Sequence, residues 1–72
     1  MNREEFLKEF KKAIQTEEDV TFESSLLNLD EWDSLGMMAT IALLDNSFNL
    51  KYTIADMQNM DTVEDLLKNT GL

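Results

Sequence analysis

The stretch DSLGMMATIALLDNSF, residues 33–48, decides the fold, because it predicts one long helix in the middle of the chain. The carboxylate of Asp33 can accept a hydrogen bond from the first turn, as N-cap residues do. Apolar residues recur in it at steps of four, three and four, and they predict a stripe that faces the core. The stripe consists of Met37, Ile41, Leu44 and Phe48. We therefore expect a helix that begins around Asp33 and ends at about Phe48.

Much of the remaining surface of this helix is apolar as well, through Leu35, Met38, Ala39, Ala42 and Leu43. A helix that is apolar nearly all round is either fully buried or keeps one face for a partner. Seventy-two residues leave room for only one small core. We therefore expect a partner-binding face on this helix.

Ser34 lies at the expected start of the helix. A helix N-terminus presents unpaired N–H groups and the positive end of the helix dipole, which suits a phosphate ester. The ordinary alternative is a serine that is favourable in a first turn for local reasons alone. A nucleophilic serine needs an activating base, yet the chain has no histidine and no lysine close to Ser34 in sequence. The serine is therefore interpreted as an attachment point, and the chain as a protein that is not an enzyme.

Three further helices are expected around the central one. The first has a capping-box pair in Asn2 and Glu5, followed by the periodic apolar residues Phe6, Leu7, Phe10, Ala13 and Ile14. A short third helix runs from about Thr53 to Met60. The last opens at the capping pattern of residues 61–64, turns Val63, Leu66 and Leu67 inward, and stops near Gly71.

The first two helices are joined by a long connection, Val20 to Trp32, which shows no sustained period. It is too apolar for a disordered linker, so we expect it to be pinned to the core. Long loops in compact domains are usually functional, although a plain crossover is the structural alternative. The prediction is one all-α domain over residues 1–72, a four-helix bundle with a long first loop.

The net charge of −9 argues against nucleic acid or an anionic membrane as partner, because both need basic side chains to neutralise phosphates. Seven acids and no base lie between Glu17 and Asp33. They do not form an EF-hand loop: counted from Asp30, the third, sixth and twelfth positions are Trp32, Leu35 and Ile41. No metal site is predicted. The longest nearly apolar run, residues 37–44, falls far short of the ~20 residues that span a bilayer, so a cytoplasmic protein is expected.

The helix order, the acidity and the sequence Asp33-Ser34-Leu35 together resemble the acyl carrier protein family, and the resemblance covers nearly the whole chain. It implies that Ser34 receives 4'-phosphopantetheine from coenzyme A through a magnesium-dependent phosphopantetheinyl transferase, with Asp33 helping to position it. It further implies a monomer whose arm presents thioesters to loading and transfer enzymes. The residues expected to contact these partners are Leu35, Met38, Ala42 and Asp45.

The chain departs from the family's pattern in ways that bear on its cargo. Asp45 is the only acid on the second helix after Asp33, where fatty-acid carriers are rich in Glu, and Glu31-Trp32 replaces the family's usual glycine. These differences favour a stand-alone carrier in a specialised pathway over one of bulk fatty-acid synthesis. An aminoacyl carrier similar to the D-alanyl carrier proteins is the alternative within the family. Outside the family, the alternative is a small acidic module that binds a partner helix.

Overall fold

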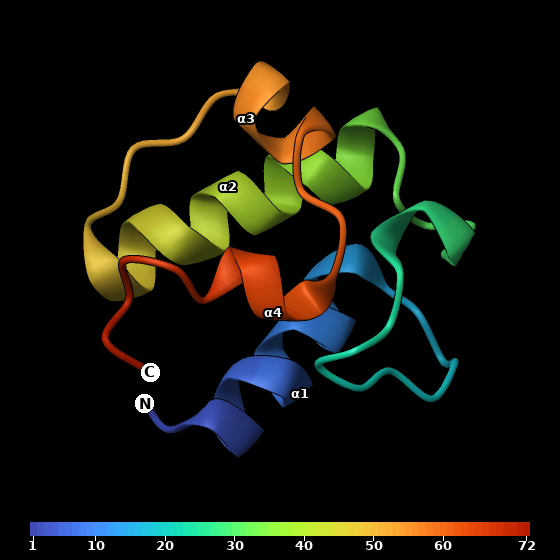
Figure 1. The fold of residues 1–72 in the computed structure, drawn as a ribbon, viewed down its shortest axis with the longest axis horizontal. Helices are drawn as coiled ribbons and strands as arrows, with labels where there is room; N and C mark the ends of the chain where they lie inside the picture. The colour runs from blue at the N-terminus through green and yellow to red at the C-terminus, as the bar shows by residue number, and fades with distance from the viewer.

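The computed structural model describes residues 1–72 and is all-helical (Figure 1). Four α-helices follow one another along the chain: α1 (Arg3–Ile14), α2 (Ser34–Phe48), α3 (Ile54–Gln58) and α4 (Val63–Leu66). One turn of 3-10 helix, η1 (Leu26–Asn28), interrupts the long connection between α1 and α2 and was not predicted. The small all-α bundle with a long first loop and a short third helix is confirmed.

The ends of α1 follow the signals in the sequence. Asn2 Oδ1 accepts a hydrogen bond from the Glu5 N–H at 2.8 Å, and Glu5 Oε1 accepts one from the Asn2 N–H at 3.1 Å. This is the predicted capping box. Gln15 adopts a left-handed conformation, with φ of 60°, and ends the helix. The inner face of α1 buries Phe6, Phe10 and Ile14.

Helix α2 begins and ends where the sequence predicts, but its inner face is rotated slightly from the predicted stripe. Leu44 is fully buried, whereas the other three residues of the stripe are only half-buried against the core. Gly36 and Thr40 are the buried residues of α2 that were not predicted, and Thr40 has 0% exposure. The Thr40 Oγ1 donates a hydrogen bond to the Gly36 carbonyl at 2.8 Å, and this bond offsets the cost of removing the hydroxyl from water.

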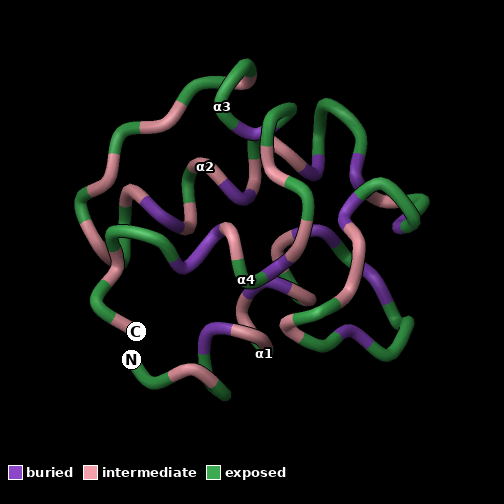
Figure 2. Tube along the Cα trace, viewed as in Figure 1, coloured by how far each residue is buried: buried purple, intermediate pink, exposed green.

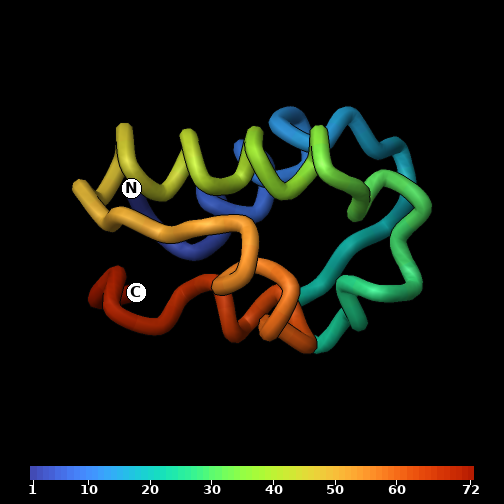
Figure 3. The backbone as a smooth tube through the Cα atoms, turned by 90° about the horizontal axis from the view of Figure 1, so that it is seen from above, coloured from blue at the N-terminus to red at the C-terminus, as the bar shows by residue number.

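The long connection is pinned to the core as expected, through buried side chains of Val20, Leu26, Leu29 and Trp32. Its backbone also bonds to the segment that leads into α4. The Leu26 N–H donates to the Asp61 carbonyl at 2.9 Å, and the Val63 N–H donates to the Ser24 carbonyl at 3.1 Å. Seen from above, the middle of this connection lies beside the segment that leads into α4, and its end runs back to the start of α2 on the other side of the molecule (Figure 3).

The C-terminal helices are shorter than predicted, and α4 is capped differently. Residues 61–64 were expected to form the capping pair, but the carboxylate that accepts the backbone hydrogen bonds belongs to Asp65. It accepts from the Asp61 N–H at 2.9 Å and from the Thr62 N–H at 3.1 Å. The three apolar residues predicted to face inward, Val63, Leu66 and Leu67, are all buried.

A single apolar cluster joins all four helices and the long connection (Figure 2). At its centre the Phe6 and Phe10 rings stack with centroids 6.4 Å apart, and the ring centroids of Trp32 and Phe10 lie 6.2 Å apart.

None of the four helices has the length and apolar character that a membrane-spanning helix needs.

Arg3 joins both ends of the chain to the first loop. Its Nη1 donates to the Leu72 carbonyl at 2.9 Å, its Nη2 pairs with the Glu64 carboxylate, and its guanidinium lies 4.4 Å from the centre of the Phe22 ring. One side chain thus connects α1, α4, the loop and the C-terminus.

Candidate functional site at the start of α2

Ser34 is the first residue of α2, and its side chain is exposed. Asp33 is the N-cap: its Oδ1 accepts a hydrogen bond from the Gly36 N–H at 2.9 Å. The Ser34 hydroxyl makes no hydrogen bond within the chain. The N–H groups of Ser34 and Leu35 belong to the first turn, where a helix offers them no acceptor. An anion attached to this hydroxyl would therefore meet free backbone donors and the positive end of a 15-residue helix.

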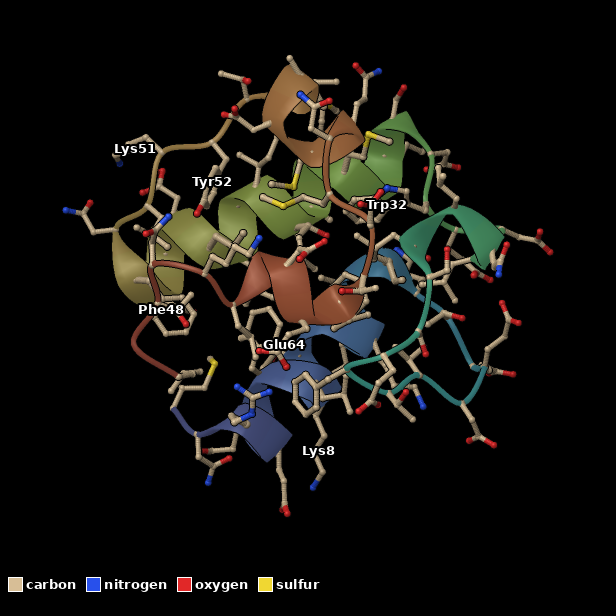
Figure 4. All side chains as sticks on the ribbon, in the orientation of Figure 1. Lys8, Trp32, Phe48, Lys51, Tyr52 and Glu64 are labelled. Carbon is tan, nitrogen blue, oxygen red and sulfur yellow. The ribbon has the colours of Figure 1, made fainter.

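The segment that leads to Ser34 is held in place by one large side chain. The Trp32 side chain is 8% exposed and points into the fold (Figure 4). The backbone N–H of Trp32 donates a hydrogen bond to the Leu29 carbonyl at 3.0 Å. Its ring contacts Phe10 of α1, so α1 and the start of α2 are joined through aromatic packing. The position of Ser34 is consequently tied to the core two residues before it.

Gly36 is a site residue that the sequence analysis missed. A Cβ atom at this position would lie 2.1 Å from the backbone carbonyl oxygen of Glu31, a distance that real contacts do not reach. Glycine therefore allows residues 31–33 to fold directly against the first turn of α2. The sequence did contain a signal for this role. Gly36 is in the third position of the expected helix, where glycine lowers helix stability by up to ~1 kcal/mol relative to alanine.

A groove lies beside Ser34, between the end of α1 and the start of α2. Its volume is about 410 Å³. One wall comes from α1 and the other from the approach to α2 and its first turns; the lining residues are Ala13, Ile14, Gln15, Glu31, Asp33, Leu35, Gly36 and Ala39. The lining is half hydrophobic. The Oε1 atom of Glu31 is buried and has no hydrogen-bond partner, and it is the only such side-chain atom in the protein.

The outer face of α2 carries the exposed apolar residues that the sequence predicts. Leu35 is 73% exposed, Met38 is 51% exposed, and Ala42 is exposed as well. Asp45, also predicted to contact partners, is partly buried, and its Oδ1 lies 2.5 Å from Lys51 Nζ. Its charge is therefore compensated within the chain. Leu27 of η1 is 75% exposed and was not predicted to belong to any surface of interest.

The chemistry available at this site is that of a hydroxyl and a helix end. The chain contains neither histidine nor cysteine, and no lysine lines the groove. No three Asp or Glu side chains gather closely enough to hold a metal ion. What the arrangement offers is an exposed hydroxyl at the start of a capped helix.

The chain matches no protein-family model, and neither the curated proteins nor the solved structures give a significant match.

Proposed function

We propose that this protein is a carrier protein, modified on Ser34 by 4'-phosphopantetheine, that presents acyl or aminoacyl groups to other enzymes. The observation that carries the proposal is the exposed, unbonded hydroxyl at the first position of a capped 15-residue helix. The resemblance of residues 33–35 to the attachment motif of acyl carrier proteins supports it. When bound, the group supplies a terminal thiol on which cargo is held as a thioester, and this chemistry is missing from a chain without cysteine.

In the proposed modification the Ser34 hydroxyl oxygen attacks the phosphoryl group of coenzyme A that bears the pantetheine. The new P–O bond forms as the phosphoanhydride bond breaks, adenosine 3',5'-bisphosphate leaves, and the serine proton passes to the transferase or to water. The residues of this chain act by position. Asp33 holds the first turn of α2 through its hydrogen bond with the Gly36 N–H. The free N–H groups of that turn would favour the negative charge of a phosphodiester on Ser34.

The direct test is the intact mass of the protein after incubation with a phosphopantetheinyl transferase, magnesium and coenzyme A. Wild-type protein should gain the mass of one phosphopantetheine. Ser34→Ala should gain none while keeping its helical circular-dichroism spectrum, since an exposed first-turn serine contributes little to stability. Ser47→Ala is the matched control, because Ser47 is an exposed serine near the other end of the same helix; this variant should be modified normally. A mass gain on the Ser34→Ala protein would show that the attachment site is wrong.

A second candidate function rests on the exposed apolar face of α2. Leu35 and Met38 gain nothing for folding where they lie, so a small acidic module that binds a partner through them is the alternative. The same mass measurement separates the two functions. Wild-type protein that gains no mass with any transferase tested would favour the module.

A further inference from the structure

We propose that Met38, on the outer face of α2, is a site of reversible oxidation: a peroxide converts its thioether to a sulfoxide, and the sulfoxide hinders the enzymes that act on Ser34. The first half of this proposal concerns the Met38 side chain alone. The second half rests on the proposed function and adds a way in which that function is regulated. The starting point is the sulfur content of the chain, which has five methionines and no cysteine.

The five methionine side chains differ widely in exposure. Met57 is 0% exposed, and Met37 and Met60 are partly buried against the core. Met1 and Met38 are half exposed, at 50% and 51%. A dissolved oxidant has to reach the sulfur atom of a thioether before it can react. Met1 and Met38 should therefore be oxidised before the other three.

The position of Met38 distinguishes it from Met1. Met38 lies four residues after Ser34, which is one turn further along the same side of α2. Side chains at this spacing are neighbours on a helix surface, with Cβ atoms roughly 5–6 Å apart. Leu35 and Ala42, three residues before Met38 and four after it, are exposed as well. Met38 is thus in the middle of the apolar surface beside Ser34, whereas the N-terminus lies at the other end of the molecule (Figure 1).

The chemical step needs only the thioether and a peroxide. A lone pair of the sulfur attacks one oxygen of hydrogen peroxide, the S–O bond forms as the O–O bond breaks, and proton transfer leaves a sulfoxide and one water molecule. The sulfur is oxidised by two electrons and the peroxide is reduced. The product is a polar side chain in place of an apolar one, and methionine sulfoxide reductases can restore the thioether.

Oxidation of Met38 should affect folding and recognition differently. Met38 belongs neither to the buried cluster nor to the residues packed against it, so a sulfoxide oxygen at this position stays in water and leaves the fold intact. A partner that covers the outer face of α2 has to remove that oxygen from water, which is unfavourable unless the partner donates a hydrogen bond to it. The sulfoxide should therefore weaken recognition of a protein that is still folded.

The first experiment locates the oxidation in the protein before phosphopantetheine is attached, so that the thiol of the arm takes no part. Wild-type protein is treated with hydrogen peroxide, the peroxide is removed, and peptide mass spectrometry assigns the oxygen additions. We expect Met1 and Met38 to gain oxygen first and Met57 to gain it only in urea, with a melting temperature close to that of untreated protein. Oxidation of Met57 in the folded protein before Met38 would refute the site, and so would a large fall in melting temperature once Met38 is oxidised.

The second experiment measures the rate of phosphopantetheine transfer to each protein before and after peroxide, so that every variant is its own reference. The wild-type rate should fall several-fold and recover after treatment with methionine sulfoxide reductases. Met38→Leu cannot be oxidised at this position, and its rate should be the same before and after peroxide. Met1 is still oxidised in that variant and so controls for oxidation elsewhere in the chain. Met38→Gln imitates the polar sulfoxide, and without peroxide it should be modified more slowly than Met38→Leu.

The outcomes separate this proposal from the proposed function. If untreated wild-type protein accepts no phosphopantetheine, the carrier function fails and the regulatory effect fails with it, while the first experiment still decides whether Met38 is the oxidation site. If the protein is modified but oxidation of Met38 does not change the rate, the carrier function stands and the regulation is refuted. An equal fall in rate for wild type and Met38→Leu refutes it as well, because the cause would then lie at another residue.

Discussion

Gly36 shows how one missing methyl group shapes the approach to Ser34. Replacing it with alanine would gain up to about 1 kcal/mol in helix propensity. Against this, a Cβ atom 2.1 Å from the Glu31 carbonyl forces the backbone of residues 31–33 to move, and overpacking of this kind costs about 1–3 kcal/mol. The steric cost should win.

We therefore expect Gly36→Ala to lower the free energy of unfolding, and to shift the emission of Trp32 to longer wavelength as its ring loosens. Trp32 is the only tryptophan, so denaturant titration followed by fluorescence measures both effects. An alanine variant more stable than wild type, with unchanged emission, would show that the loop gives way without strain.

Asp65 links stability to pH. The pKa of its carboxyl group is held below the ordinary value of 3.8, first by the hydrogen bond from the Thr62 N–H, then by that from the Asp61 N–H, with Lys68 also contributing. A depressed folded-state pKa stabilises the protein above pH 3.8, and this contribution is lost as the pH falls through the lower, folded value.

Asp65→Asn should therefore lower the free energy of unfolding near neutral pH by about 1 kcal/mol, the usual effect of losing a helix cap. The difference from wild type should vanish in strongly acidic solution. Urea denaturation at both pH values checks this. Asp61→Asn is the control, since it replaces an exposed acid close to the same cap, and it should leave the free energy of unfolding near neutral pH almost unchanged. A pH-independent loss for Asp65→Asn would mean that its charge is irrelevant.

Helix α2 has one face that packs in the core and one that is exposed. Introducing glutamate on each face in turn tests what that face does. Leu44 is 0% exposed and Met38 is 51% exposed. Leu44→Glu should unfold the protein, because a buried, unpaired charge costs more than a small domain can lose. Met38→Glu should leave the melting temperature within a few degrees of wild type, yet reduce the rate of modification or loading by about tenfold, or ~1.4 kcal/mol.

Thermal melts and intact-mass time courses on the two variants provide the measurement. An unfolded Met38→Glu protein would mean that this face belongs to the core. A folded variant that is modified and loaded at the wild-type rate would remove the outer face from partner recognition.

The sequence predicts the elements whose signals are local, and it misses contacts between distant segments. The caps of α1 and α2 were found because donor and acceptor lie three residues apart, as in the pairs Asn2–Glu5 and Asp33–Gly36. The burial of Thr40 was missed for another reason: the inner face of α2 was predicted from apolar residues alone, and Thr40 is polar, although its hydroxyl donates to the Gly36 carbonyl four residues earlier in the same helix.

The groove at the candidate site could not be predicted for a related reason. It exists because Trp32 draws the approach to α2 against α1 and because Gly36 lets the Glu31 carbonyl come close. Neither relation follows from a period or a motif. The place of Ser34 at the start of α2 was predictable, because Asp33, one residue earlier, is a typical N-cap residue.

At the scale of the whole molecule, charge is distributed unevenly. None of the seven acids between residues 17 and 33 takes part in an ion pair; the four salt bridges use other acids, namely Glu9, Asp45, Glu64 and Asp65. Repulsion among the seven is therefore uncompensated within the fold, in a chain of net charge −9.

We expect added salt to raise the melting temperature by several degrees through screening, and magnesium to do so at lower concentration than sodium. Thermal melts in matched sodium and magnesium series measure this. A melting temperature that does not depend on ionic strength would show that the repulsion is already relieved. Saturation at one magnesium ion per chain would point to a defined cation site.

The contacts of Arg3 with the C-terminal residue and with Glu64 have a practical consequence for handling the protein. They bring the two ends of the chain side by side, and in Figure 1 these ends lie at the opposite end of the molecule from the start of α2. A tether at either end, to a resin, a probe or a neighbouring protein, would leave the chain with one anchored pole and one free pole. Ser34 lies at the free pole, so the molecule can be immobilised or fused without covering the hydroxyl that gives it its proposed use.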